Sequence, residues 1–275
     1  MVKQQLTIQL SDAQRIPQIG LGVWQASDDE ARAAVRVAIE EGYCHVDTAS
    51  IYGNEKGVGE GLRDSGAPRE QVFLTTKVWN NAHGFDAATA ALDASLKRLK
   101  VDYVDLLLIH WPVPSQNDYV DTWRALIEAQ RIGKAKSIGV SNFNRDHLQR
   151  LTEETGVAPV LNQIELHPFL QQRELRDVHE SMGIATQSWS PLGQGSALSN
   201  PAISEIARKH GRTAAQVIIR WHIELGLIAI PKSITPSRIY ENFNVFDFSL
   251  DTSDLAAFAA LDSGKRLGPD PSTFA

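Results

Sequence analysis

The sequence lacks the features that would crosslink the chain, anchor it in a membrane or attach it to nucleic acid. Cys44 is its only cysteine, so no intramolecular disulfide can form, and a lone thiol fits a reducing compartment. No stretch approaches the roughly 20 apolar residues of a membrane span, and the first residues lack the apolar core of a signal peptide. The net charge is -6, with both signs scattered and no basic run. We therefore expect a cytoplasmic monomer that binds neither membrane nor nucleic acid.

Several catalytic motifs are also absent. No H-x-x-x-H pair encloses a glutamate, and Glu165-Leu166-His167 has no further ligands at useful spacing, so we expect no metal site. The G-x-S-x-G turn of serine hydrolases is missing. The glycines at 57, 59 and 61 depart from G-x-G-x-x-G and fall inside a predicted helix, which favours close helix packing over a nucleotide-binding loop.

What the sequence does contain is a repeated unit of an apolar β-branched run, a polar loop and an amphipathic helix. A hairpin is expected first, over 6–10 and 15–19. The first predicted helix begins at the Ser27–Glu30 capping box and ends at Gly42. Further helices are predicted over 54–64, 86–99, 119–132, 145–154, 172–182 and 213–224. Strands are predicted at 21–23, 45–47, 72–78, 103–110, 135–141, 160–165, 184–189 and 227–230. Eight alternating units favour an α/β fold, a closed (β/α)8 TIM barrel formed by residues 1–275 as a single domain, over an open doubly wound sheet.

Polar or aromatic residues end almost every predicted strand. In a barrel of this kind, chemistry takes place at the carboxyl ends of the strands, so these side chains are expected to meet at one mouth. They are Asp47, Lys77, His110, Ser141, Asn142, Gln163 to His167, Trp189, Ser190, Lys232 and Ser233. A purely structural barrel does not need this pattern, which therefore indicates a catalytic or binding site.

Asp47, Lys77 and His110, with Tyr52 from the following loop, suit the reduction of a carbonyl group. A phenol is a weak acid at neutral pH. A nearby Lys77 ammonium would lower its pKa, and Asp47 would keep that ammonium charged. A neutral His110 could orient the carbonyl oxygen. No side chain donates hydride, so this chemistry requires a cofactor. Each residue alone also has an ordinary structural interpretation, and only their joint placement points to catalysis.

Several stretches resemble the aldo-keto reductase family over nearly the whole chain. They are 42–49 (GYCHVDTA), 52–55 (YGNE), 136–143 (KSIGVSNF) and 230–233 (IPKS) with Arg238, Glu241 and Asn242. Three others, 162–168 (NQIELHP), 188–195 (SWSPLGQG) and 266–271 (RLGPDP), are most similar to the bacterial 2,5-diketo-D-gluconate and methylglyoxal reductases within that family.

The resemblance implies a role for each matching residue. Tyr52 would be the general acid, Lys77 and Asp47 the pair that tunes it, and His110 the group that orients the carbonyl. The cofactor would contact Val23, Trp24, Asp47, Ser141, Asn142, Gln163, Trp189, Ser190, Leu192, Lys232, Ser233, Arg238, Glu241 and Asn242. Two cations beside a hydroxyl suit a 2′-phosphate, which favours NADPH over NADH.

The substrate implied by the resemblance is a small carbonyl compound. Its pocket would be formed by Trp24, Tyr52, Trp79, His110 and Trp111, while Asn80, His83 and 266–270 are candidates by position alone. Methylglyoxal-like aldehydes, β-keto esters and diketogluconate are the candidate substrates.

Two other functions stay open at this stage. One is a Schiff-base lyase that uses Lys77 or Lys232 as the amine. The other is an NADPH-binding regulatory sensor with little turnover. Cys44 stands where the family commonly has arginine, and we expect a buried structural thiol there rather than a nucleophile.

Overall fold

The computed structural model describes residues 5–274 and shows a barrel of eight parallel strands. The strands are β3 (Leu21–Gly22), β4 (His45–Asp47), β5 (Phe73–Val78), β6 (Val104–Ile109), β7 (Ala135–Ser141), β8 (Leu161–Glu165), β9 (Ala185–Trp189) and β10 (Ile228–Ala229). Each pairs with the next in sequence order. Parallel bridges from Ile19 to Ala229 and from Gly22 to Lys232 close the sheet on itself. The predicted (β/α)8 barrel is confirmed.

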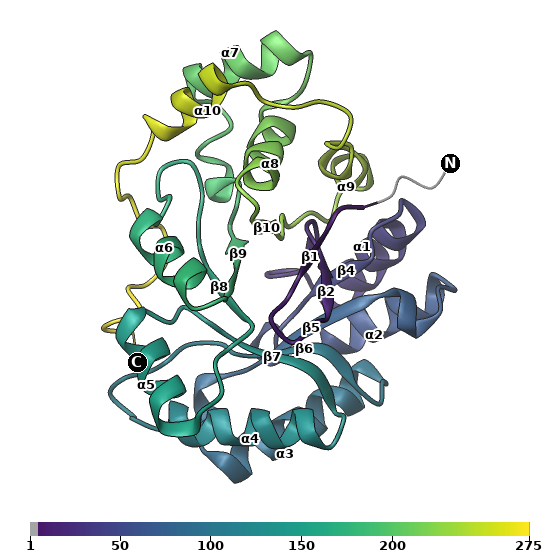
Figure 1. Ribbon diagram of the computed structural model, residues 1–275. Coiled ribbons are helices and arrows are strands. Elements are labelled where there is room, and N and C mark those ends of the chain that lie inside the picture. Colours follow the sequence, from purple (N-terminus) through teal and green to yellow (C-terminus); the bar gives the residue numbers. More distant parts are fainter. Residues whose placement is uncertain (1–4, 275) are drawn as a thin grey trace.

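The helices form a ring outside the strands (Figure 1). The ring consists of α1 (Asp28–Glu40), α2 (Glu55–Asp64), α3 (Phe85–Leu99), α4 (Tyr119–Arg131), α5 (Arg145–Thr155), α6 (Arg173–Ser181), α8 (Ala214–Glu224) and α9 (Pro236–Phe243). Two more, α7 (Pro201–His210) and α10 (Thr252–Ala259), lie together at the top of the view. Short 3-10 turns cover Ser50–Tyr52, Arg69–Gln71, Asn80–Ala82 and Gly193–Gly195. Three helices, α7, α9 and α10, were not predicted from the sequence. α7 and α10 are additional to the repeat of one helix after each strand, whereas α9 follows β10 but is only 8 residues long.

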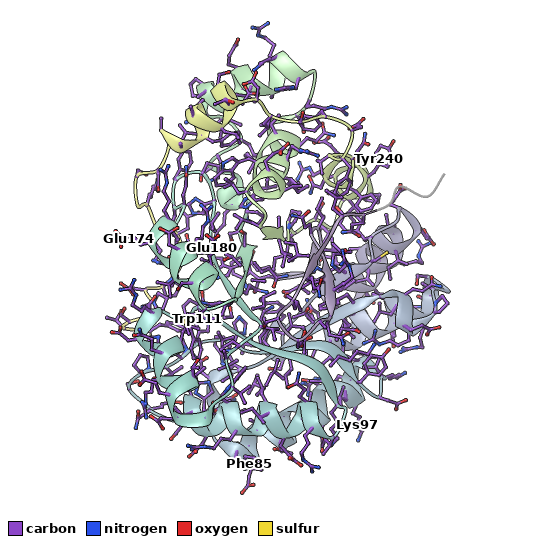
Figure 2. The ribbon with its side chains drawn as sticks, in the orientation of Figure 1. Phe85, Lys97, Trp111, Glu174, Glu180 and Tyr240 are labelled. Carbon is purple, nitrogen blue, oxygen red and sulfur yellow. The ribbon has the colours of Figure 1, made fainter. Side chains whose placement is uncertain are left out.

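Each ring helix buries one face and exposes the other. Figure 2 shows Phe85 and Lys97 of α3 and Tyr240 of α9 pointing away from the barrel. In α1, by contrast, Ala31 and Val35 are fully buried. No helix within residues 5–274 is long and apolar enough to cross a membrane.

The amino end of the barrel is closed by the predicted hairpin. Its strands, β1 (Thr7–Gln9) and β2 (Arg15–Pro17), pair antiparallel and lie across the barrel in Figure 1. Leu10 and Ile16 pack there against the barrel residues Leu106, Leu161 and Ile228, all of them buried. With this end filled by apolar side chains, the opposite end, where the strands terminate, is the one available for chemistry.

The start of α1 follows directly from its sequence. The Ser27 side chain accepts a hydrogen bond from the Glu30 backbone amide, and the Glu30 carboxylate accepts one from the Ser27 amide at 2.8 Å. This reciprocal arrangement is the predicted capping box, which satisfies amides that would otherwise have no partner. The capping box therefore fixes where the chain turns into α1 after the first barrel strand.

Close packing explains the three glycines of α2. A Cβ atom on Gly57 would lie 2.0 Å from the Asp28 carbonyl oxygen, and one on Gly59 would lie 2.1 Å from that of Leu99. On Gly61 it would lie 2.6 Å from the Arg32 carbonyl oxygen. These glycines let α2 approach neighbouring backbone, so the helix-packing interpretation is confirmed and the nucleotide-loop alternative is wrong.

Replacing Gly59 with alanine should destabilise the fold. Alanine is the better helix former, but its methyl group would push α2 off the backbone at Leu99, and overpacking of this kind costs about 1–3 kcal/mol. Urea unfolding measures the change, with Lys56→Ala on the exposed face of α2 as the control. An unchanged urea midpoint for Gly59→Ala would show that α2 can move away from Leu99, the last residue of α3, without loss of stability.

Candidate active site

A cavity of about 670 Å³ opens at the carboxyl ends of the barrel strands. Its wall combines residues 22–25 and 267–269, from near the two termini, with polar groups at the carboxyl ends of the strands. The residues that line it are Gly22, Val23, Trp24, Gln25, Asp47, Ile51, Tyr52, Trp79, His110, Trp111, Asn142, Gln163, Trp189, Ser190, Gln194, Ile230, Lys232, Leu267, Gly268, Pro269 and Phe274. The structure thus gathers in one place most of the polar strand ends that the sequence indicated.

A buried ion pair lies at the base of the cavity. Lys77 on β5 donates to the Asp47 carboxylate at the end of β4, and both side chains are almost fully inaccessible to solvent. The Lys77 ammonium also donates to the Thr48 carbonyl oxygen at 2.9 Å, and Gln163 Nε2 donates to the second Asp47 oxygen at 2.7 Å. Further hydrogen bonds of this kind are what make a buried ion pair tolerable.

Tyr52 and His110 lie next to this pair. Tyr52 ends the 3-10 turn that follows β4, and the Lys77 ammonium is 5.2 Å from the centre of its ring. The Tyr52 and His110 rings meet edge to face, with their centres 5.7 Å apart. The four residues that the sequence grouped as catalytic are therefore neighbours in space.

The pKa of the Tyr52 phenol differs from the expectation. Burial raises this pKa above its usual value, the Lys77 ammonium opposes the rise, and the net direction is upward. Lys77 therefore acts in the expected direction and lowers the Tyr52 pKa, but burial outweighs it. The reason is desolvation, which disfavours the phenolate more than one ammonium favours it. The phenol stays protonated at neutral pH, which is the form that can donate a proton.

The Lys77 and His110 pKa values shift in opposite directions. Burial alone would lower the pKa of Lys77, but Asp47 and Tyr52 outweigh it and the net direction is upward. Burial, followed by the Lys77 charge, holds the pKa of His110 well below its usual value. His110 is therefore neutral, as expected, and one of its ring nitrogens can donate a hydrogen bond into the cavity.

A polar network continues along β7, β8 and β9. Ser141 Oγ donates to the Gln163 carbonyl oxygen at 2.8 Å, and Trp189 Nε1 donates to Asn142 Oδ1 at 2.8 Å. Asn142 Nδ2 donates to the His110 carbonyl oxygen at 3.0 Å, and its backbone has a φ of 63°, a conformation that asparagine tolerates. Ser141 is buried beneath this layer, whereas Asn142, Gln163 and Trp189 line the cavity.

The remaining residues expected to contact the cofactor fall into two groups. Ser190 and Lys232 line the cavity, but Leu192, Ser233, Arg238, Glu241 and Asn242 do not. Arg238 is exposed in the first turn of α9 and makes no hydrogen bond or ion pair with the described residues. Glu241, in contrast, accepts a hydrogen bond from Thr213 Oγ1 at 2.7 Å, which ties α9 to the start of α8.

Aromatic side chains line the outer part of the cavity. Trp24, Trp79 and Trp111 all lie there as predicted, but Trp24 is 44% exposed and Trp111 only 6%. Phe274 completes the wall, with its ring centre 4.5 Å from that of Trp111. Sequence reasoning missed Phe274, because nothing local indicates where the end of the chain returns.

Three weaker suggestions have different outcomes. Of the residues 266–270, Leu267, Gly268 and Pro269 line the cavity, whereas Arg266 and Asp270 do not. Asn80 and His83 do not line it, because they lie in the turn beyond β5 rather than at the strand end. Cys44 is only half-buried, and burial raises the pKa of its thiol, which disfavours the reactive thiolate.

Comparison with known proteins identifies the family. The model of the aldo/keto reductase family matches residues 18–263, which is most of the chain. This protein belongs to the aldo/keto reductase family. It is 53% identical to the methylglyoxal reductase DkgA of Escherichia coli over 97% of both chains.

Solved structures of aldo/keto reductases agree with this membership. The structure of a Gox0644 mutant in complex with NADPH superposes with a TM-score of 0.96, at 50% identity, and covers 99% of this chain and 100% of that one. An aldo/keto reductase of Brucella melitensis superposes with a TM-score of 0.92, at 54% identity, over 94% of this chain and all of that one.

Replacing Lys77 with methionine should destabilise the protein strongly. The change leaves the Asp47 carboxylate buried without its cation, and breaking a buried pair on one side costs about 3–5 kcal/mol. Urea unfolding measures the loss, with the exposed Lys97→Met of α3 as the matched control (Figure 2). Adding Asp47→Asn should restore part of the loss, because it removes the unpaired charge. Equal stability for the two lysine variants would contradict the coupling.

Proposed function

We propose that this protein reduces aldehydes and ketones to alcohols with NADPH, with Tyr52 as the proton donor. The observation that carries the proposal is the buried Lys77–Asp47 pair directly behind the Tyr52 phenol and His110, at the wall of an open cavity. Membership of the aldo/keto reductase family supports it, as do the NADPH complex of Gox0644 and the name of the E. coli relative.

The residues around the start of α9, which follows the cavity-lining Lys232, fit the adenosine part of NADPH. Pro236, the first residue of α9, has no amide hydrogen, but the N-cap Thr235 makes no side-chain capping bond, so the Ser237 and Arg238 amides are left to bind an anion. Arg238 has no competing partner among the described residues, and Lys232 and Ser233 precede the helix. A 2′-phosphate would find two cations, a hydroxyl and the helix dipole in one place.

The nicotinamide end would lie over the polar network. Ser141, Asn142 and Gln163 would hold its carboxamide, and the Trp189 ring, oriented by its bond to Asn142, would stack on its face. Val23, Trp24, Ser190 and Leu192 would line the path between the two ends. When bound, NADPH supplies the hydride that no side chain can provide.

The chain's own residues account for the proton. The Tyr52 phenol donates its proton to the carbonyl oxygen as hydride reaches the carbon. The Lys77 ammonium stabilises the phenolate that remains, and Asp47 holds this ammonium in place and charged. Neutral His110 donates a hydrogen bond to the same oxygen and fixes its orientation. A lyase that uses Lys77 is disfavoured, because an ion-paired ammonium with a raised pKa is a poor nucleophile.

The cavity favours small or flat uncharged substrates. Within residues 5–274, the charged residues that line the cavity are Asp47 and Lys232. Asp47 is paired with Lys77, and the proposal assigns Lys232 to the 2′-phosphate of NADPH. No cation is then left for a substrate carboxylate, whereas Trp24, Trp79 and Trp111 offer apolar surface. We expect methylglyoxal-like aldehydes, β-keto esters and aromatic aldehydes to be better substrates than diketogluconate.

We also propose that residues 1–275 act as one domain, since the cavity needs Gly22 near one end of the chain and Phe274 near the other. The cytoplasmic location and the monomeric state are predictions from the sequence.

Loss of NADPH absorbance with a panel of carbonyls tests the proposed reaction. The panel holds methylglyoxal, a β-keto ester, an aromatic aldehyde and diketogluconate, each repeated with NADH. Tyr52→Phe should lower kcat by at least about 100-fold, the usual contribution of a general acid, and leave the NADPH Kd nearly unchanged.

Tyr103→Phe, which loses the same hydroxyl at the start of β6, is the control for Tyr52→Phe. Full activity of Tyr52→Phe would remove Tyr52 from the acid role. Tight NADPH binding by the unaltered protein without turnover of any substrate would favour the sensor alternative.

Arg238→Ala should weaken NADPH binding far more than NADH binding. Losing a charge-assisted hydrogen bond to the 2′-phosphate corresponds to about a tenfold rise or more in the NADPH Kd, and NADH lacks this phosphate. Quenching of tryptophan fluorescence measures both constants, with the exposed Arg208→Ala of α7 as the control. Equal losses for the two cofactors would discard the 2′-phosphate assignment.

A further inference from the structure

A buried carboxylate at the end of β8 holds the C-terminal segment. Glu165 is completely inaccessible to solvent. Its Oε1 accepts a hydrogen bond from the Leu267 backbone amide at 2.6 Å, and its Oε2 accepts one from the Gly268 amide at 3.0 Å. Arg266 Nη1 lies 3.5 Å from Oε2. One side chain of the barrel thus binds consecutive amides roughly a hundred residues further along the sequence.

His167 keeps this carboxylate in position. Its Nε2 is 3.1 Å from Glu165 Oε1, and its Nδ1 accepts a hydrogen bond from the Phe169 backbone amide at 3.3 Å. A ring nitrogen that accepts carries no proton, so the proton is on Nε2 and is donated to Glu165. Burial alone would raise the pKa of Glu165, but the hydrogen bonds from His167, Leu267 and Gly268 outweigh it and the net direction is downward. Glu165 is therefore ionised.

The segment held by Glu165 is part of the cavity wall. After α10 the chain forms no further helix or strand up to residue 274, and in Figure 1 it runs from α10 past α6 to α5. A Cβ on Gly268 would lie 2.4 Å from the Trp189 ring, so backbone packs directly on that indole. Beyond Gly268, Asn144 Nδ2 donates to Ser272 Oγ at 3.0 Å, and Phe274 meets Trp111.

We propose that Glu165 is a positioning residue that fixes residues 266–274 over the cavity and thereby sets which carbonyl substrates fit. The inference rests on the proposed reductase function. Glu165 does not line the cavity, so it acts only through the segment it holds. Large flat substrates that reach Phe274 depend on this wall, whereas the smallest dicarbonyls, which need only Tyr52 and His110, do not.

Glu165→Gln tests the proposal with little change in size. The amide nitrogen of glutamine donates and cannot accept, so one of the two backbone amides loses its acceptor. We expect the KM for an aromatic aldehyde to rise about tenfold, the effect of losing one charge-assisted hydrogen bond. The KM for methylglyoxal, the kcat for both substrates and the NADPH Kd should change much less. Glu174→Gln on α6, where the side chain points to solvent, is the matched control (Figure 2).

Hydrogen exchange gives a readout that needs no turnover. The Leu267 and Gly268 amides should exchange slowly in the unaltered protein and in Glu174→Gln, and at least one should exchange faster in Glu165→Gln. Amides of Leu267 and Gly268 that exchange as fast as exposed amides in the unaltered protein would overturn the proposal, even if Glu165→Gln failed to fold. Slow exchange together with no carbonyl turnover would instead reject the proposed function alone.

Truncation after Lys265 separates positioning from a general structural role. The shortened chain should show the same rise in KM for the aromatic aldehyde. Adding Glu165→Gln to it should change that KM no further, because the segment on which Glu165 acts is gone. An additional rise in the double variant, or an unchanged KM in Glu165→Gln itself, would overturn the proposal.

Discussion

The ion pair of Lys77 and Asp47 is the interaction on which the site depends. Removing two charges from water costs several kcal/mol for each ion, and attraction offsets this only with good geometry and further hydrogen bonds. The barrel provides that geometry, because β4 and β5 are adjacent parallel strands with Asp47 opposite Thr75, two residues before Lys77. Thr48 and Gln163 supply the remaining hydrogen bonds. Strand register therefore determines whether the pair is tolerable.

The same pair explains how a weak acid can serve at neutral pH. A phenol is already protonated at neutral pH, and burial raises the Tyr52 pKa further, so the proposed acid carries its proton before any substrate arrives. The Lys77 charge then favours the phenolate once the proton has left. Burial also keeps His110 neutral, so no second positive charge stands beside the Lys77 ammonium. Desolvation thus favours the neutral form of both groups at the cavity wall.

The two ends of the barrel have different tasks: the amino end is packed for stability, and the carboxyl end holds the cavity. The hairpin fills the amino end with apolar side chains, and the C-terminal segment covers part of the carboxyl end. This segment has little secondary structure of its own, so its position comes from a few contacts with the barrel, those of Glu165 foremost. A wall held in this way can vary in shape without disturbing the strands beneath it.

The sequence by itself determined the strands, most of the ring helices and the grouping of Asp47, Tyr52, Lys77 and His110 at one site. Buried parallel strands are continuous apolar runs, and polar residues mark the carboxyl ends of these strands, so both signals are local in sequence. Family motifs supplied the roles of residues such as Ser141 and Arg238. Helices additional to the repeat, such as α7, gave no comparable signal.

Only the tertiary structure decided the upward shift of the Tyr52 pKa and the contribution of Phe274 and Glu165. Desolvation depends on every neighbour around a group, and a contact between residues about a hundred positions apart leaves no local pattern. The end of the chain returns to the cavity because β8 presents a buried carboxylate to two free amides, a match that exists only after the barrel has closed.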